Sequence, residues 1–177
     1  MATQTKWVLD PMHSEVQFKV KHLVISTVTG SFKKFEGDLV TDHDDFSDAE
    51  VNFNLDVNSI DTTQEARDQH LTSAEFFDAA QYPHISFKST SFTKDGENYK
   101  LAGHLTIKDV TKPIVLDVEF GGIAADFYGN TKAGFEATGK INRKEYGLTW
   151  EGITDAGAIV VGDEIKLIIN AQFAKQA

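Results

Sequence analysis

The chain has 177 residues, and its 17 Lys and Arg against 27 Asp and Glu give a formal net charge of −10. Proteins bind nucleic acid or an anionic bilayer through clustered Lys and Arg, so this charge argues against both as partners. Apolar residues make up 41% of the chain, and there is no Cys. The composition predicts one globular domain over residues 1–177 and excludes disulfides, thiolate catalysis and Cys-ligated metals.

The N-terminal segment MATQTKWVLD leads directly into a strand-like segment. It lacks the basic and apolar regions of a secretory signal, and no apolar run approaches the roughly 18 residues of a membrane-spanning helix. From this we expect a soluble protein of the cytoplasm.

The main signal along the chain is the alternation of apolar and polar residues, which is typical of half-buried β-strands. In EVQFKVKH it places Val16, Phe18 and Val20 on one face. The same pattern recurs over residues 28–39, 51–57, 85–87, 99–107, 114–120, 133–141 and 165–173. A one-residue slip at Lys33 and Lys34 suggests a β-bulge. These runs predict about eight antiparallel strands.

Two stretches depart from this alternation. Residues 59–83 are rich in Ala, Glu, Gln and Arg, and Thr62 with Glu65, like Thr72 with Glu75, fits a capping box. We therefore expect two short helical pieces there, packed across one end of the sheet. Residues 142–162 are expected to form glycine-rich turns.

A sheet of about eight strands with one apolar face must close on itself or pack against a second sheet. Hairpin-like connections and the lack of a long partner helix favour an all-β protein built as a closed barrel. Such a barrel is either filled by side chains or holds one slender ligand, and the pattern leaves both open. Glycines on the inward faces, Gly30, Gly103 and Gly139, mark either a bend or the close approach of a ligand.

The sequence contains no strong catalytic or metal-binding motif. Asp10, His13 and Ser14 lie within one short turn, which favours an Asx-type turn over a catalytic triad. None of the six His shows the tight spacing of metal ligands. His22 and His104 are the pair that could face inward together, but hydrogen-bonded histidines are the more common case. We therefore predict no catalytic residue, metal or cofactor.

Arg143 and Lys144 form one of the few basic spots on this acidic chain. Such a spot could contact an anionic head group at the mouth of a barrel. A paired surface turn is the alternative, and it is the one that we favour.

Several blocks, in order, resemble the YceI-like family of lipocalin-like, polyisoprenoid-binding proteins: WVLDPMHSEVQFKVKH, GSFKKFEGDL, SIDTTQEARDQHLTSAEFFDAAQYPHISFKST, GHLTIKDVTKPIVLDVEF, INRKEYGLTW and VVGDEIKLIINAQF. The resemblance implies an extended eight-stranded antiparallel barrel with a helix near one end. It implies an apolar tunnel for an isoprenoid chain, such as a polyprenyl phosphate or a quinone tail, or for another long aliphatic lipid. It implies no catalytic residues. Many members of the family carry a secretory signal, which this N-terminus does not match.

The resemblance supplies no binding residues that can be transferred, so ligand contacts are predicted from the inward faces of the strands. They are Phe18, Val20, Phe32, Phe53, Leu55, Phe87, Leu105, Leu116, Phe135 and Leu167, with Arg143 near the head group. The predicted function is non-enzymatic binding, carriage or sequestration of a long-chain isoprenoid or fatty lipid, and the resemblance is compatible with a homodimer.

Two alternatives remain open at this point. One is an enzyme that acts on a hydrophobic substrate through His13, His22 or His104. The other is a barrel with a filled core that serves as an interaction module.

Overall fold

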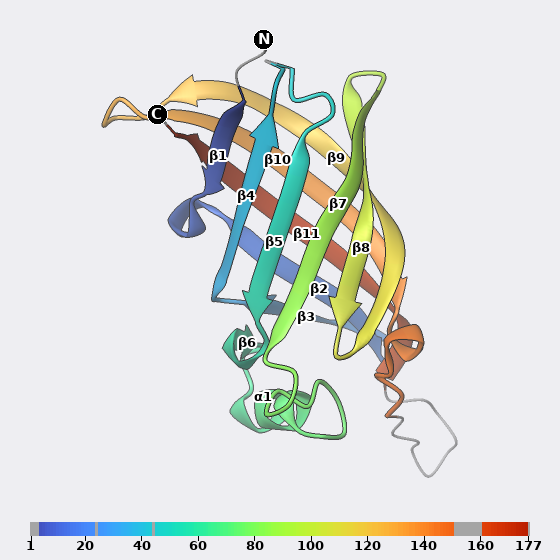
Figure 1. Ribbon diagram of the computed structural model, residues 1–177. Helices are drawn as coiled ribbons and strands as arrows, with labels where there is room; N and C mark the ends of the chain where they lie inside the picture. The colour runs from blue at the N-terminus through green and yellow to red at the C-terminus, as the bar shows by residue number, and fades with distance from the viewer. Residues whose placement is uncertain (1–3, 24, 44, 151–160, 177) are drawn as a thin grey trace.

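The computed structural model describes residues 4–23, 25–43, 45–150 and 161–176. Within them, strands follow one another in the order β1-β4-β5-β7-β8-β9-β10-β11, and a further pairing of β1 with β11 closes this sheet into an antiparallel barrel. The barrel predicted from the sequence is therefore confirmed (Figure 1). Its strands are β1 (Thr5–Leu9), β4 (Phe35–Thr41), β5 (Glu50–Asp56), β7 (His84–Asp95), β8 (Asn98–Ile107), β9 (Val110–Ala125), β10 (Thr131–Asn142) and β11 (Val161–Lys175).

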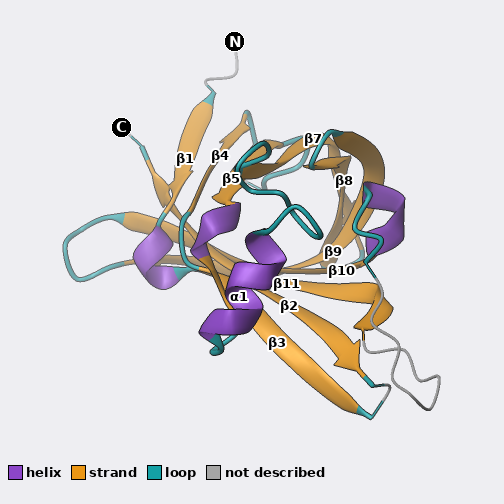
Figure 2. Cartoon of the chain, turned by 90° about the horizontal axis from the view of Figure 1, so that it is seen from below, coloured by secondary structure: helices purple, strands orange, loops and turns teal. Residues whose placement is uncertain are grey.

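The long strand β11 has two successive neighbours on one side. Its last residues, 173–175, pair with β1, whereas its residues 161–170 pair with β2 (Glu15–His22). β2 continues the sheet to β3 (Ser26–Phe32), and β3 pairs with the short β6 (Ile60–Asp61). We call β2 and β3 the wing. Figure 2 shows the wing diverging from the barrel beside α1 (Glu65–Thr72).

The slip at Lys33 and Lys34 is a change of strand partner, so the predicted β-bulge is wrong. β3 is bonded to β2, whereas β4 is bonded to β1 and β5. The chain thus passes from the wing to the barrel wall at these two lysines. Alternation follows the buried face of each strand and carries no signal about which neighbour that strand pairs with.

One α-helix, α1, occurs in the described residues, and residues 73–81 form turns instead of the second predicted helix. The expected capping box at Thr62 does not form, because Gln64 takes the N-cap position without a side-chain bond. The Oδ1 atom of Asp68 instead accepts the backbone N–H of Thr62 at 2.9 Å and its hydroxyl at 2.5 Å. No helix of the described chain has the length and apolar character to cross a bilayer.

The remaining short helices between strands are 3₁₀ turns: η1 (Pro11–His13), η2 (Val57–Ser59) and η3 (Arg143–Tyr146). As expected, the segment around α1 lies across one end of the barrel (Figure 1). The irregular stretch expected over residues 142–162 is found in part: η3 and a turn at Gly147 occur in it, whereas Val161 and Gly162 already belong to β11, so the turn expected there is wrong. Residues 151–160 lie outside the described residues.

The opposite end of the barrel is filled by aromatic side chains. Phe46, from the connection between β4 and β5, is 1% exposed. Its ring centroid lies 5.1 Å from that of Trp7 and 5.2 Å from that of Phe135. Such tilted and edge-on contacts add to the stabilisation from burial. We call this group the aromatic layer: Trp7, Phe46, Phe92, Tyr99, Phe120, Phe135 and Phe173.

A shielded ion pair fixes the seam where β1 closes the barrel. Oδ2 of Asp10 lies 2.7 Å from Nζ of Lys132 on β10, and their side chains are 17% and 13% exposed. Asp10 also accepts the backbone N–H of Met12, and the hydroxyl of Ser14 accepts that of Gln172. The expected Asx-type turn is therefore confirmed. The hydrogen bond from Lys132 is the main cause that lowers the pKa of Asp10 from 3.8 to about 2.

Replacing Lys132 by methionine should destabilise the fold in a pH-dependent way. Because the pKa of Asp10 is lowered by folding, the pair's contribution is complete above about pH 5 and is lost as the pH falls from about 4 toward 2. We expect Lys132→Met to lower the free energy of unfolding by about 1–2 kcal/mol at neutral pH and far less near pH 2.5. Urea unfolding at both pH values measures this difference.

Lys140→Met is the matched control, because the Nζ of Lys140 lies 3.9 Å from Glu164 in an exposed pair. Its effect should stay below about 0.5 kcal/mol. A loss for Lys132→Met that is the same at both pH values would contradict the role assigned to Asp10.

Candidate ligand-binding cavity

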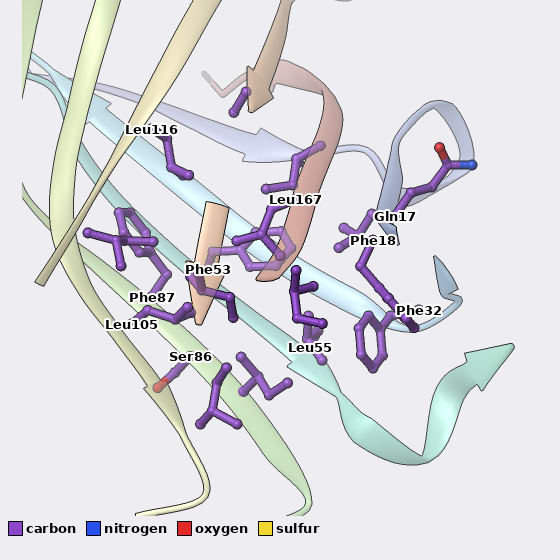
Figure 3. Close-up of a pocket in the computed structure, with 18 of the residues that line it drawn as sticks. Gln17, Phe18, Phe32, Phe53, Leu55, Ser86, Phe87, Leu105, Leu116 and Leu167 are labelled. Carbon is purple, nitrogen blue, oxygen red and sulfur yellow. The ribbon is translucent and has the colours of Figure 1, made fainter. Parts of the chain in front are cut away.

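An apolar cavity of about 210 Å³ lies inside the barrel and the base of the wing, between the aromatic layer and the α1 segment. The predicted apolar contacts all line it, and Figure 3 shows several of them around the space. They are Phe18 and Val20 of β2, Phe32 of β3, Phe53 and Leu55 of β5, Phe87 of β7, Leu105 of β8, Leu116 of β9, Phe135 of β10 and Leu167 of β11. The interior is hollow, so the filled-core alternative is wrong.

Strand pairing explains why these side chains converge. Phe53 of β5 is the cross-strand partner of Phe87 of β7, and Phe18 of β2 is that of Leu167 of β11. Partners in an antiparallel sheet point to the same face, and closure of the sheet turns that face inward. Alternation along each strand thus becomes one continuous apolar wall.

The polar residues that border the cavity do not make it polar. Gln17 and Ser86 lie between inward-facing neighbours on β2 and β7. The oxygen and nitrogen atoms of these two side chains point away from the cavity in Figure 3. Among the described residues, Arg143 is the one charged residue of the lining. The surface that the lining presents to the cavity is therefore apolar.

Arg143 is buried rather than part of a surface turn. Its side chain is 2% exposed, which makes the surface interpretation wrong, although the side chain is indeed paired. Nη1 donates to the carbonyls of Leu148 and Trp150 at 2.6 and 2.8 Å. Nε donates to the carbonyl of Gly162 at 2.9 Å. The guanidinium thus ties η3 and the residues after it to the start of β11, and its contact with a head group remains a prediction.

Several lining residues were not predicted as ligand contacts. Leu71, Phe76 and Phe77 line the cavity on the side of α1, and the sequence indicated only that this segment packs on the sheet. Phe92 escaped because the register of β7 shifts between Ser89 and Ser91. This shift turns Phe92, 2% exposed, toward the interior, and alternation carries no signal for it.

The histidines considered for catalysis do not reach the cavity. His104 is exposed on β8 between two buried residues, so it does not face inward. His13 is exposed and contacts Asp10. His22, the last residue of β2, is the cross-strand partner of Val161 and does not itself line the cavity. Over the described ranges, no group of His, Asp and Glu side chains is placed to hold a metal ion. None of the three histidines named for the enzyme alternative is therefore part of the described cavity lining.

A closed antiparallel barrel around an apolar cavity, with a helical segment across one end, defines a lipocalin-like binding protein. The chain matches the model of the YceI-like domain over residues 7–173. It is 38% identical to a UPF0312 protein of Pectobacterium carotovorum, over 99% of this chain and 88% of that protein. Protein YceI of Salmonella newport is also 38% identical, over 99% and 89%. The chain therefore belongs to the YceI-like family, as the sequence blocks predicted.

Solved structures agree with this assignment. The YceI protein of Campylobacter jejuni superposes with a TM-score of 0.74 at 34% identity, covering 89% of this chain and 90% of that one. BcnA of Burkholderia cenocepacia has a TM-score of 0.80 at 22% identity, covering 93% and 98%. A polyisoprenoid binding domain of Saccharophagus degradans has a TM-score of 0.68 at 15% identity, covering 96% and 98%. The last two likenesses show a shared fold.

Proposed function

We propose that this protein binds and carries a long-chain isoprenoid or a similar aliphatic lipid in its barrel, without catalysing a reaction. The observation that carries this proposal is the apolar cavity of about 210 Å³ inside a closed barrel. Protein interiors are normally packed to the density of organic crystals, so a hollow apolar core is suited to an apolar guest. The polyisoprenoid binding domain of Saccharophagus degradans, which shares this fold, supports the choice of ligand class.

The size of the cavity sets the expected length of the buried chain. A water-sized group needs about 10–15 Å³ of internal cavity volume, so there is room for roughly 15 methylene-sized groups. Each buried methylene contributes about 0.8 kcal/mol, and association costs at least about 4 kcal/mol. A chain of about a dozen carbons therefore gains net affinity. A longer polyprenyl chain leaves its remainder outside, so affinity should level off beyond this length.

Bound lipid should be detectable in protein purified from its own host. We expect organic extraction of detergent-free protein, followed by mass spectrometry, to release a stoichiometric isoprenoid or other long aliphatic lipid. Protein carrying Phe53→Asp, purified in parallel, should release none and controls for lipid bound to the outer surface. An extract of the native protein that contains no more lipid than this control would overturn the proposal.

A further inference from the structure

Gly30, on the inner face of the wing, lies directly beneath an aromatic ring. Gly30 of β3 is the cross-strand partner of Phe18 of β2, and Phe18 lines the cavity. A Cβ atom added at Gly30 would lie 2.6 Å from Cε1 and 2.9 Å from Cε2 of the Phe18 ring. These distances are far below van der Waals contact, so the ring occupies the space that a side chain at position 30 would need.

Two other strand glycines receive a neighbour's side chain in the same way. A Cβ at Gly139 of β10 would collide with Cδ2 of Leu116 on β9, and one at Gly103 would lie 2.5 Å from Cζ of Phe87. The sequence left these glycines as either bends or points of ligand approach. The structure shows a third role, because each provides a seat in the wall for a large side chain of an adjacent strand.

Seating affects the free space in the barrel. A side chain that lies flat over a glycine stays close to the strands and takes little of the cavity volume. If a methyl group at the glycine position displaces that side chain, it moves into the cavity and reduces its volume. A phenyl ring contains six carbons and would take the room of roughly six of the 15 or so methylene-sized groups that the cavity holds. The cavity therefore has room for an aliphatic ligand because these side chains lie against the glycines.

We propose that Gly30 and Gly139 are specificity-determining residues, which set the length of the aliphatic chain that fits by seating Phe18 and Leu116 against the wall. This inference rests on the proposed function. These two positions are the most informative, because only the far ends of flexible side chains obstruct an added Cβ there. At Gly103 the backbone carbonyl of Lys88 also lies 2.5 Å away, so a substitution would strain the sheet itself.

The test is a competition among chains of different length. Each variant is incubated with an equimolar series of straight-chain primary alcohols of roughly 10 to 20 carbons, supplied from phosphatidylcholine vesicles, and the alcohols bound after gel filtration are quantified by mass spectrometry. We expect Gly30→Ala and Gly139→Ala to lower the chain length at which affinity levels off by roughly three to six carbons. Since each excluded methylene costs about fourfold in affinity, the ratio of the longest to the shortest bound alcohols should fall at least about tenfold.

Gly134→Ala is the matched control, because Gly134 is also a strand glycine of β10 but no atom lies within 4 Å of an added Cβ there. It should keep the distribution of the unmodified protein. Gly30→Ala combined with Phe18→Ala should recover the longer alcohols, because the displaced ring is gone. Circular dichroism shows which variants are folded, and Gly139→Ala tests the proposal independently if Gly30→Ala is not.

The outcomes distinguish a protein that binds no aliphatic chain from one that binds chains without selecting their length through Gly30 and Gly139. If the unmodified protein takes up no alcohol of any length, the proposed function fails. If it takes them up and both alanine variants match Gly134→Ala, the cavity binds chains but the seated side chains do not select their length. A shortened preference that the double variant does not reverse would also overturn the inference.

Discussion

Replacing Phe53 by aspartate is expected to abolish lipid retention, with a loss of at least about 100-fold in affinity for an aliphatic chain. Phe53 projects from β5 into the cavity, where its ring stacks on Phe35 with centroids 6.1 Å apart. A carboxylate at this point must stay hydrated or lose its charge, and either state costs several kcal/mol in an apolar cavity. Lipid uptake from vesicles, measured together with the melting temperature, checks the prediction.

The control for this substitution is Asn54→Asp. Asn54 is the next residue of β5 and is exposed on the outer face, so it adds the same charge to the same strand. Lipid uptake should not change there. Full retention by a folded Phe53→Asp protein would remove the cavity from consideration as the binding site.

Replacing Arg143 should produce the largest loss of stability. Its side chain bonds to carbonyls on both sides of residues 151–160, and removing a buried partner of this kind typically costs about 3–5 kcal/mol. We expect a loss of that size for Arg143→Met and only partial rescue by Arg143→Lys, because an ammonium lacks the planar fork of five donors. Urea unfolding measures both variants.

Lys144→Met serves as the control, since Lys144 is adjacent, 34% exposed and 3.4 Å from the same Asp163 that Arg143 faces. Its loss of stability should remain below about 1 kcal/mol. The same variants also test the head-group role predicted for Arg143. An Arg143→Lys protein of unchanged stability that loses only its affinity for anionic lipids would favour that role over the structural one.

The wall of the cavity was predictable because a two-residue period records which face of a strand is buried. The period holds from Val16 to Val20 and from Ile165 to Phe173, and these faces do line the cavity. What the period does not record is pairing. The change of partner at Lys33 and the register shift before Phe92 therefore became visible only in the structure.

Other contacts could not be predicted because they do not depend on the types of the residues nearby in the sequence. The acceptors of Arg143 are backbone carbonyls. Every residue has such a carbonyl, so the neighbouring residue types could not predict the burial of Arg143. The seats at Gly30 and Gly139 depend on which side chain of an adjacent strand lies opposite. Such contacts follow from the register between strands, which alternation alone does not specify.

The aromatic layer also has a consequence for the kinetics of exchange. Because Phe46 and its neighbours fill one end of the barrel, we expect the proposed lipid to enter and leave away from that end, on the side of α1, with its tail leading inward. Its polar end then stays at the point of entry, accessible to another protein while the tail is shielded. Departure requires withdrawal of the whole buried length, so the residence time of a ligand should increase with the number of carbons inside.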